Sequence, residues 1–294
     1  MVVFSGLGVA VAGFFSVTVA AGSFAAIAVG FGTQFLLGAA LQALTPKPSI
    51  SGASRGYQVN TRGSALDHQI IYGKVRVGGA IVYDEATGTN NKFLHRIIAV
   101  AGHEVESFDE IYINDEIITL DGSGNVTSPS RYNGKVRINL HLGSPDQAAD
   151  TDLVAESDKW TAQHRLRGIA YMYVRLAFDA DAFPNGVPTI TATVKGKKVY
   201  NPDTDTTVWS DNPALCLRDY LTSTYGLAEV PSNIDDTLVT AASTVCSQID
   251  TDAGTTRYTC NGAFTTSVTP YEAINNLLTS MGGTLWYAQG KWRM

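Results

Sequence analysis

The strongest constraint in this sequence is an N-terminal run without any charged residue, which extends from Met1 to Pro46. Its stretch 22–44 is long enough to cross a bilayer, because a transmembrane helix needs about 20 apolar residues. After Lys47 the chain has the mixed polar and apolar pattern of a water-soluble protein. We therefore expect residues 1–45 to be an apolar, helical segment that the assembled protein shields from water.

This apolar segment differs from a secretory signal peptide, because no lysine or arginine precedes its apolar core. Positive charge also orients it poorly in a membrane, since only Lys47 and Arg55 follow it closely. The flanking charges therefore give little support to a permanent membrane anchor with a fixed orientation.

Small residues in the apolar segment recur at every fourth position, at Gly22, Ala26 and Gly30. On a helix they form one smooth stripe, which favours close contact between helices. We expect this stripe, with Phe31 and Phe35 beside it, to contact other copies of the chain.

The composition limits the classes of function. A chain of 294 residues can form two domains with cores of their own, and its net charge of −6 disfavours general nucleic-acid binding. The three cysteines, Cys216, Cys246 and Cys260, have no CxxC spacing and do not form a disulfide scaffold. We expect buried free thiols, with a Cys246–Cys260 disulfide as the alternative.

The chain is predicted to contain four parts. Residues 1–45 are the apolar segment, and residues 46–56 form a linker rich in proline, serine and glycine. Residues 57–200 are mainly β, with one helical excursion near 150–166. Residues 201–294 have an α+β pattern. The predicted fold class is therefore mainly β with an α+β C-terminal part.

Within residues 57–200, alternating apolar residues predict hairpins over 68–85 and a long strand over 93–105. Asn114 and Asp115 predict a tight turn between two strands. Residues 168–179 predict a central strand, and residues 189–200 predict another.

Within residues 201–294, a first helix is predicted to begin at Pro213, with Asp211 or Asn212 as its cap. A second helix is predicted over 235–249, a strand over 256–266, and a third helix that ends at Gly282. A last hairpin turns at Gln289, and its returning strand stops at Met294. We expect this chain to be one part of a longer polypeptide.

Motifs for catalysis are weak in this chain. The sequence His103-Glu104-Val105-Glu106 lacks the second histidine of a metalloprotease motif, and we interpret it as a solvated turn. The pair Asp179 and Asp181 lacks the glycine and glutamate of a calcium loop, so we interpret it as a wide turn. GxSxG, P-loop and dinucleotide motifs do not occur. We expect no catalytic, metal or cofactor site.

The C-terminal third resembles the central tail hub, or tip-attachment protein, of long-tailed bacteriophages similar to lambda. The features that carry this resemblance occur in a shared order, and they are Asn212–Leu221, Tyr225-Gly226, Cys246, Thr259-Cys260-Asn261, Ala273–Met281 and Trp286–Trp292. Further segments of related tail proteins resemble residues 70–83, 94–105, 182–188 and 195–204, so the resemblance covers roughly residues 57–294. The motifs are structural rather than catalytic, and the apolar segment departs from the family pattern.

The resemblance implies a homotrimer that closes the distal end of the tail tube, with tail-tube-like β domains. It implies contacts with the distal tail protein, with other tail-tip proteins and with the C-terminus of the tape-measure protein in the lumen. DNA would pass through that lumen without specific nucleic-acid binding. Three apolar segments on the threefold axis would then plug the lumen, with or without entry into the host envelope during ejection.

Two other classes of function remain open from the sequence. The first is a membrane-anchored bacterial surface or secretion component, in which the apolar segment is a permanent anchor. The second is a cell-wall hydrolase carried on a tail, because two carboxylates can meet from anywhere in a fold.

Overall fold

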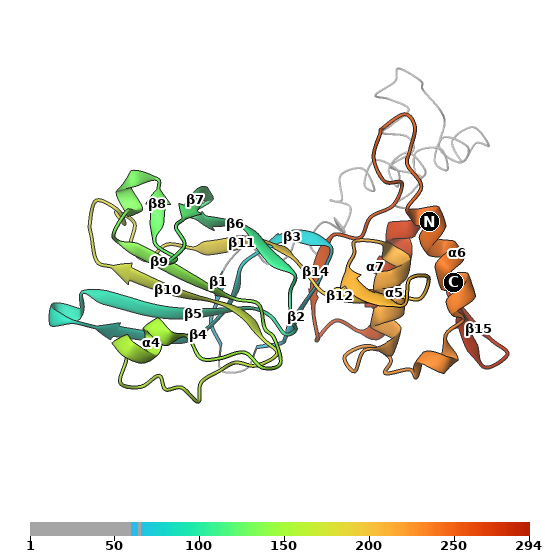
Figure 1. Ribbon diagram of the computed structural model, residues 1–294, viewed down its shortest axis with the longest axis horizontal. Helices are drawn as coiled ribbons and strands as arrows, with labels where there is room; N and C mark the ends of the chain where they lie inside the picture. The colour runs from blue at the N-terminus through green and yellow to red at the C-terminus, as the bar shows by residue number, and fades with distance from the viewer. Residues whose placement is uncertain (1–59, 64–65) are drawn as a thin grey trace, which may run out of the picture. The chain divides into compact units, whose positions relative to one another are not determined.

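The computed structural model describes residues 60–63 and 66–294 (Figure 1). The apolar segment and the linker lie outside these residues, and so do Gly22, Ala26, Gly30, Phe31 and Phe35. Within the described residues the chain is mainly β, with helices in its C-terminal part, as the sequence predicts. No helix in this described portion is both long and apolar enough to cross a membrane.

The first part of the fold contains two five-stranded sheets. In spatial order, the strands of the first sheet are β1 (Asn60–Thr61), β4 (Gly79–Thr87), β5 (Phe93–Ala101), β10 (Ala170–Ala177) and β9 (Val136–His141). Those of the second are β3 (Lys74–Val77), β11 (Ile190–Lys195), β6 (Ser107–Ile113), β7 (Glu116–Leu120) and β8 (Val126–Ser128). Neighbouring strands are antiparallel, except that β1 runs parallel to β4.

One apolar core lies between these two sheets. Met172 and Val174 of β10 point into it, as does Val194 of β11 from the opposite sheet, and all three are fully buried. Side chains alternate across a strand, so Tyr171 and Tyr173 lie on the other face of the first sheet. On that face, Tyr171 and Tyr173 pack against Leu153 and Trp160. Strand β10 is therefore buried on both faces, which agrees with its predicted central position.

The predicted turn between β6 and β7 is confirmed. Asn114 and Asp115 both have positive φ, of 49° and 67°, and β6 and β7 pair directly across them. Two-residue hairpins need this backbone conformation, because it matches the twist of the flanking strands.

The C-terminal part contains α-helices and short antiparallel strand pairs (Figure 1). The helices are α5 (Pro213–Thr222), α6 (Asp236–Cys246) and α7 (Pro270–Met281). The short strands of this part are β12 (Lys198–Asn201), β13 (Thr206–Trp209), β14 (Gly262–Thr265), β15 (Trp286–Ala288) and β16 (Lys291–Arg293). The early strand β2 (Gln69–Tyr72) pairs with β14. Buried residues from all three helices, with Ile70, Tyr72 and Val199, form a second core.

The predicted helix ends are confirmed. The side chain of Asn212 accepts a hydrogen bond from the backbone N–H of Ala214, and Pro213 occupies the first turn. Helix α7 ends at Gly282, which has a left-handed φ of 61°. Both features follow from local chemistry, since asparagine caps an N-terminus and glycine tolerates the left-handed conformation.

Three predictions about strands and helices are corrected. Residues 68–85 do not form successive hairpins, because β2 pairs with the distant β14 and β3 pairs with β11. The run 189–200 divides into β11 and β12 around Gly196, which approaches the backbone of Ile71. The helical excursion is only α4 (Thr151–Glu156), and the segment after it follows the sheet surface as loops and turns.

Candidate functional site

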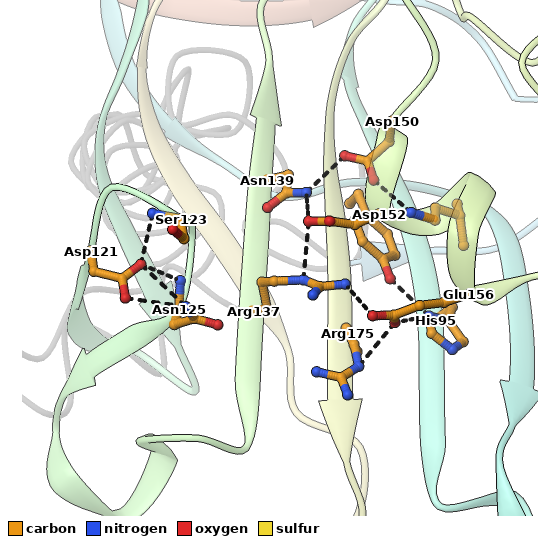
Figure 2. Close-up of polar contacts among 12 residues, drawn as sticks. His95, Asp121, Ser123, Asn125, Arg137, Asn139, Asp150, Asp152, Glu156 and Arg175 are labelled. Atoms are coloured by element: carbon orange, nitrogen blue, oxygen red, sulfur yellow. Dashed lines mark hydrogen bonds and ion pairs between the residues drawn. The ribbon is translucent and has the colours of Figure 1, made fainter.

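A cluster of charged and aromatic side chains lies on the outer face of the first sheet, beneath α4. Its aromatic part contains Tyr171 and Tyr173 of β10 and Trp160 of the following loop, all buried. Its charged part comes from β9, β10 and α4, whose side chains point toward one another (Figure 2). This arrangement forms because alternate residues of β9 and β10 point away from the sandwich core.

Glu156, at the end of α4, is held by two arginines. Its carboxylate lies 2.9 Å from a terminal nitrogen of Arg137 and 3.0 Å from Nε of Arg175 (Figure 2). Arg137 also approaches Asp152, whose carboxylate is 3.4 Å from Nε. These pairs join α4 to β9 and β10, and the arginines are largely shielded from solvent, with 15% and 24% of their side chains exposed.

His95 of β5 is fully buried at the edge of this cluster. Its Nδ1 lies 2.8 Å from the hydroxyl of Tyr173, and its Nε2 lies 2.7 Å from that of Thr87. Burial lowers the pKa of His95, against the opposing charge of Glu156. The neutral imidazole therefore links β4 to β10 through these two hydrogen bonds.

Asp150 caps α4 and closes the other end of the cluster. Its carboxylate accepts hydrogen bonds from the N–H of Leu153 at 2.8 Å, from Asn139 at 2.9 Å and from His141 at 2.8 Å. Burial alone would raise the pKa of Asp150, but these hydrogen bonds outweigh it and hold the pKa below its usual value. The capping carboxylate is thereby fixed in its ionised form.

A smaller polar motif lies between β7 and β8. One carboxylate oxygen of Asp121 accepts hydrogen bonds from the backbone N–H groups of Ser123 and Asn125, each at 2.8 Å (Figure 2). This is the usual way in which an aspartate stabilises a tight loop.

A second charged cluster joins the helical part, which contains α5, α6 and α7, to the β part, which contains the two five-stranded sheets. Asp219 of α5 accepts hydrogen bonds from Tyr72 of β2 at 2.6 Å and from Lys197 at 2.8 Å. Tyr225 approaches both, at 3.2 Å from the carboxylate and 2.8 Å from the ammonium group. Burial would lower the pKa of Lys197, but Asp219 and Tyr225 raise it, so the lysine is held charged.

These clusters suit cohesion better than catalysis. Glu156 and Asp150 have both carboxylate oxygens engaged, and one oxygen of Asp219 accepts from Tyr72, Lys197 and Tyr225. Carboxylates that are held in this way are poor general bases or nucleophiles. Among the described residues, no three His, Cys, Asp or Glu side chains are placed to bind a metal ion. What the arrangement can do is fix α4 to a sheet and α5 to the β part.

The interpretation of His103 as part of a solvated turn is wrong. His103 is 8% exposed, its Nε2 accepts a hydrogen bond from the N–H of Ile71 at 2.9 Å, and its Nδ1 bonds to the carbonyl of Glu104. Burial lowers its pKa to about 4. The residue links two strands as a neutral imidazole, because the loop after β5 folds back onto β2.

The expectation of buried free thiols is confirmed, since Cys216, Cys246 and Cys260 are free and buried. The wide turn at Asp179 is also confirmed, because its carboxylate accepts hydrogen bonds from the N–H groups of Asp181 and Ala182.

The cluster beneath α4 is not predicted from the sequence. The sequence pattern that could indicate this cluster is the alternation of polar and aromatic residues on two strands. It consists of Arg137, Asn139 and His141 on β9, and of Tyr171, Tyr173 and Arg175 on β10. Such alternation normally marks a solvent-exposed face, and here a short helix covers it. The predicted contact residues of the apolar segment lie outside the described residues and stay a prediction.

Comparisons with known proteins give one sequence relationship. The chain is 26% identical over 246 residues to the baseplate hub protein pb3 of Escherichia phage T5. The match covers 61% of this chain and 26% of that protein, so the chain corresponds to about a quarter of its relative's length. No family model matches the chain.

One chain of a solved structure, described as the virion of a native gene transfer agent particle, was also found. It is 18% identical, with a TM-score of 0.36, and the match covers 47% of this chain and 28% of that one. The sequence relationship to the T5 protein agrees with the resemblance at the level of a phage tail hub or baseplate protein. It does not extend to the tip-attachment protein of lambda-like phages in particular.

Proposed function

We propose that this chain is a non-enzymatic structural subunit of a bacteriophage tail hub, located in the virion at the distal end of the tail. The observation that carries this proposal is the sequence relationship to a phage baseplate hub protein. The charge clusters agree with it, because their ion pairs fix α4 to the first sheet and α5 to the connection after β11.

We further propose that three copies assemble around the tail axis. The number three comes from the resemblance to central tail hubs, which implies a homotrimer. The apolar run 1–45, which needs a partner surface, and its stripe of Gly22, Ala26 and Gly30 agree with contact between copies. Three such segments, with Phe31 and Phe35, would fill the lumen of the hub. The C-terminus of the tape-measure protein would contact them from inside, and the distal tail protein and other tail-tip proteins would contact the β part.

The decisive experiment is an image reconstruction of intact particles that carry the chain with an epitope tag in the exposed turn at Gly186. Label on the tail axis at the distal end, in about three copies per particle, is the expected result. Label on the host envelope with none on the particle would instead support a membrane-anchored bacterial component.

The apolar segment can be tested separately with a peptide that spans residues 1–44. Leakage of dye from liposomes would support entry into the host envelope, whereas no leakage and no membrane binding would leave only a plug in the lumen. A peptide with Gly22, Ala26 and Gly30 replaced by leucine is the matched control for helix contact, since it keeps the apolar character.

The hydrolase alternative has its own test. A zymogram of the purified chain on peptidoglycan should show no cleared band. Clearing that persists in a heat-refolded sample would revive the enzyme hypothesis.

A further inference from the structure

Two of the three buried thiols lie beside each other in the helical part. Cys216 is in the first turn of α5 and is fully buried, and Cys260 lies just before β14 and is 9% exposed. Both reach the same backbone segment: the N–H of Cys260 donates to the carbonyl of Asp211 at 2.6 Å, and the thiol of Cys216 lies 3.8 Å from the carbonyl of Ser210. The two thiols also contact each other, and this contact, with burial, raises the pKa of Cys216.

We infer that Cys216 and Cys260 are a redox site that forms an intramolecular disulfide when a small-molecule disulfide, such as oxidised glutathione, reaches the folded protein. Cys260 reacts first because it is the more exposed of the two. Its thiolate attacks the small disulfide, forms a mixed disulfide and releases one small thiolate. Cys216 then loses its proton and attacks the sulfur of Cys260, which releases the second small thiol. One dithiol and one disulfide therefore become one protein disulfide and two small thiols.

The third cysteine has a different environment. Cys246 ends α6, and its thiol faces the backbone N–H of Ala214, while burial raises its pKa. Its backbone carbonyl accepts a hydrogen bond from the N–H of Tyr258 at 3.2 Å, but its thiol faces Ala214, whereas the thiol of Cys216 contacts Cys260. We therefore expect Cys216 to pair with Cys260, rather than Cys246 with Cys260.

The Cys216–Cys260 disulfide would link α5 covalently to the segment before β14. The residues after Cys260 form β14, which pairs with β2, and the side chain of Asn261 accepts a hydrogen bond from the N–H of Lys74 at 2.7 Å. A disulfide to α5 would fix this connection covalently and would close a long loop between residues 216 and 260. Closing such a loop restricts the unfolded chain, so the midpoint of thermal unfolding should rise by roughly 5–10 °C.

The test treats the full chain with oxidised glutathione, blocks the remaining thiols by alkylation and identifies linked peptides by mass spectrometry. The expected result is a mass lower by two hydrogen atoms before alkylation, one alkylated cysteine after it, and a Cys216–Cys260 linked peptide. The Cys246→Ala variant should form the same bond, whereas Cys260→Ala should form none. The stabilisation should disappear when a reductant is added.

Three free thiols in the oxidised, folded, unmutated protein would overturn the inference, and so would a linked peptide that contains Cys246. Because the unmutated chain supplies both readouts, a variant that fails to fold does not obscure the answer. The inference does not depend on the proposed function, since it can hold in a protein from any source.

Discussion

The ammonium group of Lys197 lies 2.8 Å from a carboxylate oxygen of Asp219, and this ion pair joins the connection after β11 to helix α5. Tyr72 donates a hydrogen bond to the same carboxylate oxygen at 2.6 Å. The pair is mostly shielded, with 22% and 14% of the two side chains exposed. Substitutions in this ion pair should therefore report how strongly the β and helical parts stabilise each other.

Replacing this lysine should destabilise the protein. In Lys197→Met the carboxylate of Asp219 stays buried without its cation, which typically costs about 3 kcal/mol of unfolding free energy. The neighbouring Lys198→Met is the matched control, because Lys198 pairs with Glu104 and Glu106 at an exposed site and should cost less than about 0.5 kcal/mol. Urea unfolding measures both, and equal effects of the two variants would contradict the role of the buried pair.

Acid should destabilise the protein through His103. Its pKa is about 4 in the folded state and ordinarily about 6.5 when unfolded, so the unfolded chain binds more protons between these values. The stabilisation is complete above pH 6.5 and is lost as the pH falls towards 4, in total about 3 kcal/mol. Protonation would also place an N–H against the N–H of Ile71.

The measurement is the unfolding free energy of the unmutated protein and of His103→Gln as a function of pH. The difference between the two curves isolates this histidine from carboxylates that titrate in the same range. A difference that stays constant between pH 7 and 4 would exclude the proposed proton linkage.

Removing the shared anion beneath α4 should loosen the outer face of the first sheet. Glu156→Ala leaves Arg137 and Arg175 without their common carboxylate, and we expect a loss of about 2 kcal/mol, reduced by partial solvent exposure. Asp158→Ala, two residues further on at an exposed position, should change stability by less than about 0.5 kcal/mol. Hydrogen exchange at Leu153 should accelerate only in the first variant.

A methyl group at Gly73 should disrupt the junction between β2 and β3. Gly73 has a φ of +64°, and an added Cβ would lie 2.0 Å from the carbonyl oxygen of Cys260. Gly73→Ala should therefore cost about 3 kcal/mol, from the left-handed backbone and from the steric clash. Gly122→Ala is the control, since its Cβ would meet nothing within 4 Å, and thermal unfolding compares the two.

The features that the sequence predicts correctly are local ones. The cap at Asn212, the stop at Gly282 and the turn at Asn114-Asp115 each depend on a few neighbouring residues and on their backbone preferences. The hairpin with its turn at Gln289 is likewise confirmed, because β15 and β16 pair directly. The mainly β class follows from alternation along single strands.

The features that the sequence does not predict depend on distant partners. Nothing near residue 70 indicates that β2 pairs with β14, and nothing near Arg137 indicates that α4 covers it. The burial of His103 is not predicted for the same reason, since its partner Ile71 belongs to the distant strand β2. The predicted boundary between residues 57–200 and 201–294 stays a prediction. Ile70, Tyr72 and Val199 precede this boundary in the sequence, yet they contribute to the second core.

The pairing of β2 with β14 has a consequence for biosynthesis. Ile71 is bonded into a ladder opposite Ala263, so the ribosome must have translated and released almost all of the described chain before that ladder can close. Until then the early strand has an unsatisfied edge, and long-range pairing of this kind is intrinsically slow. Newly made chains should thus complete their surfaces only late in synthesis, and association with other subunits before folding would be disfavoured.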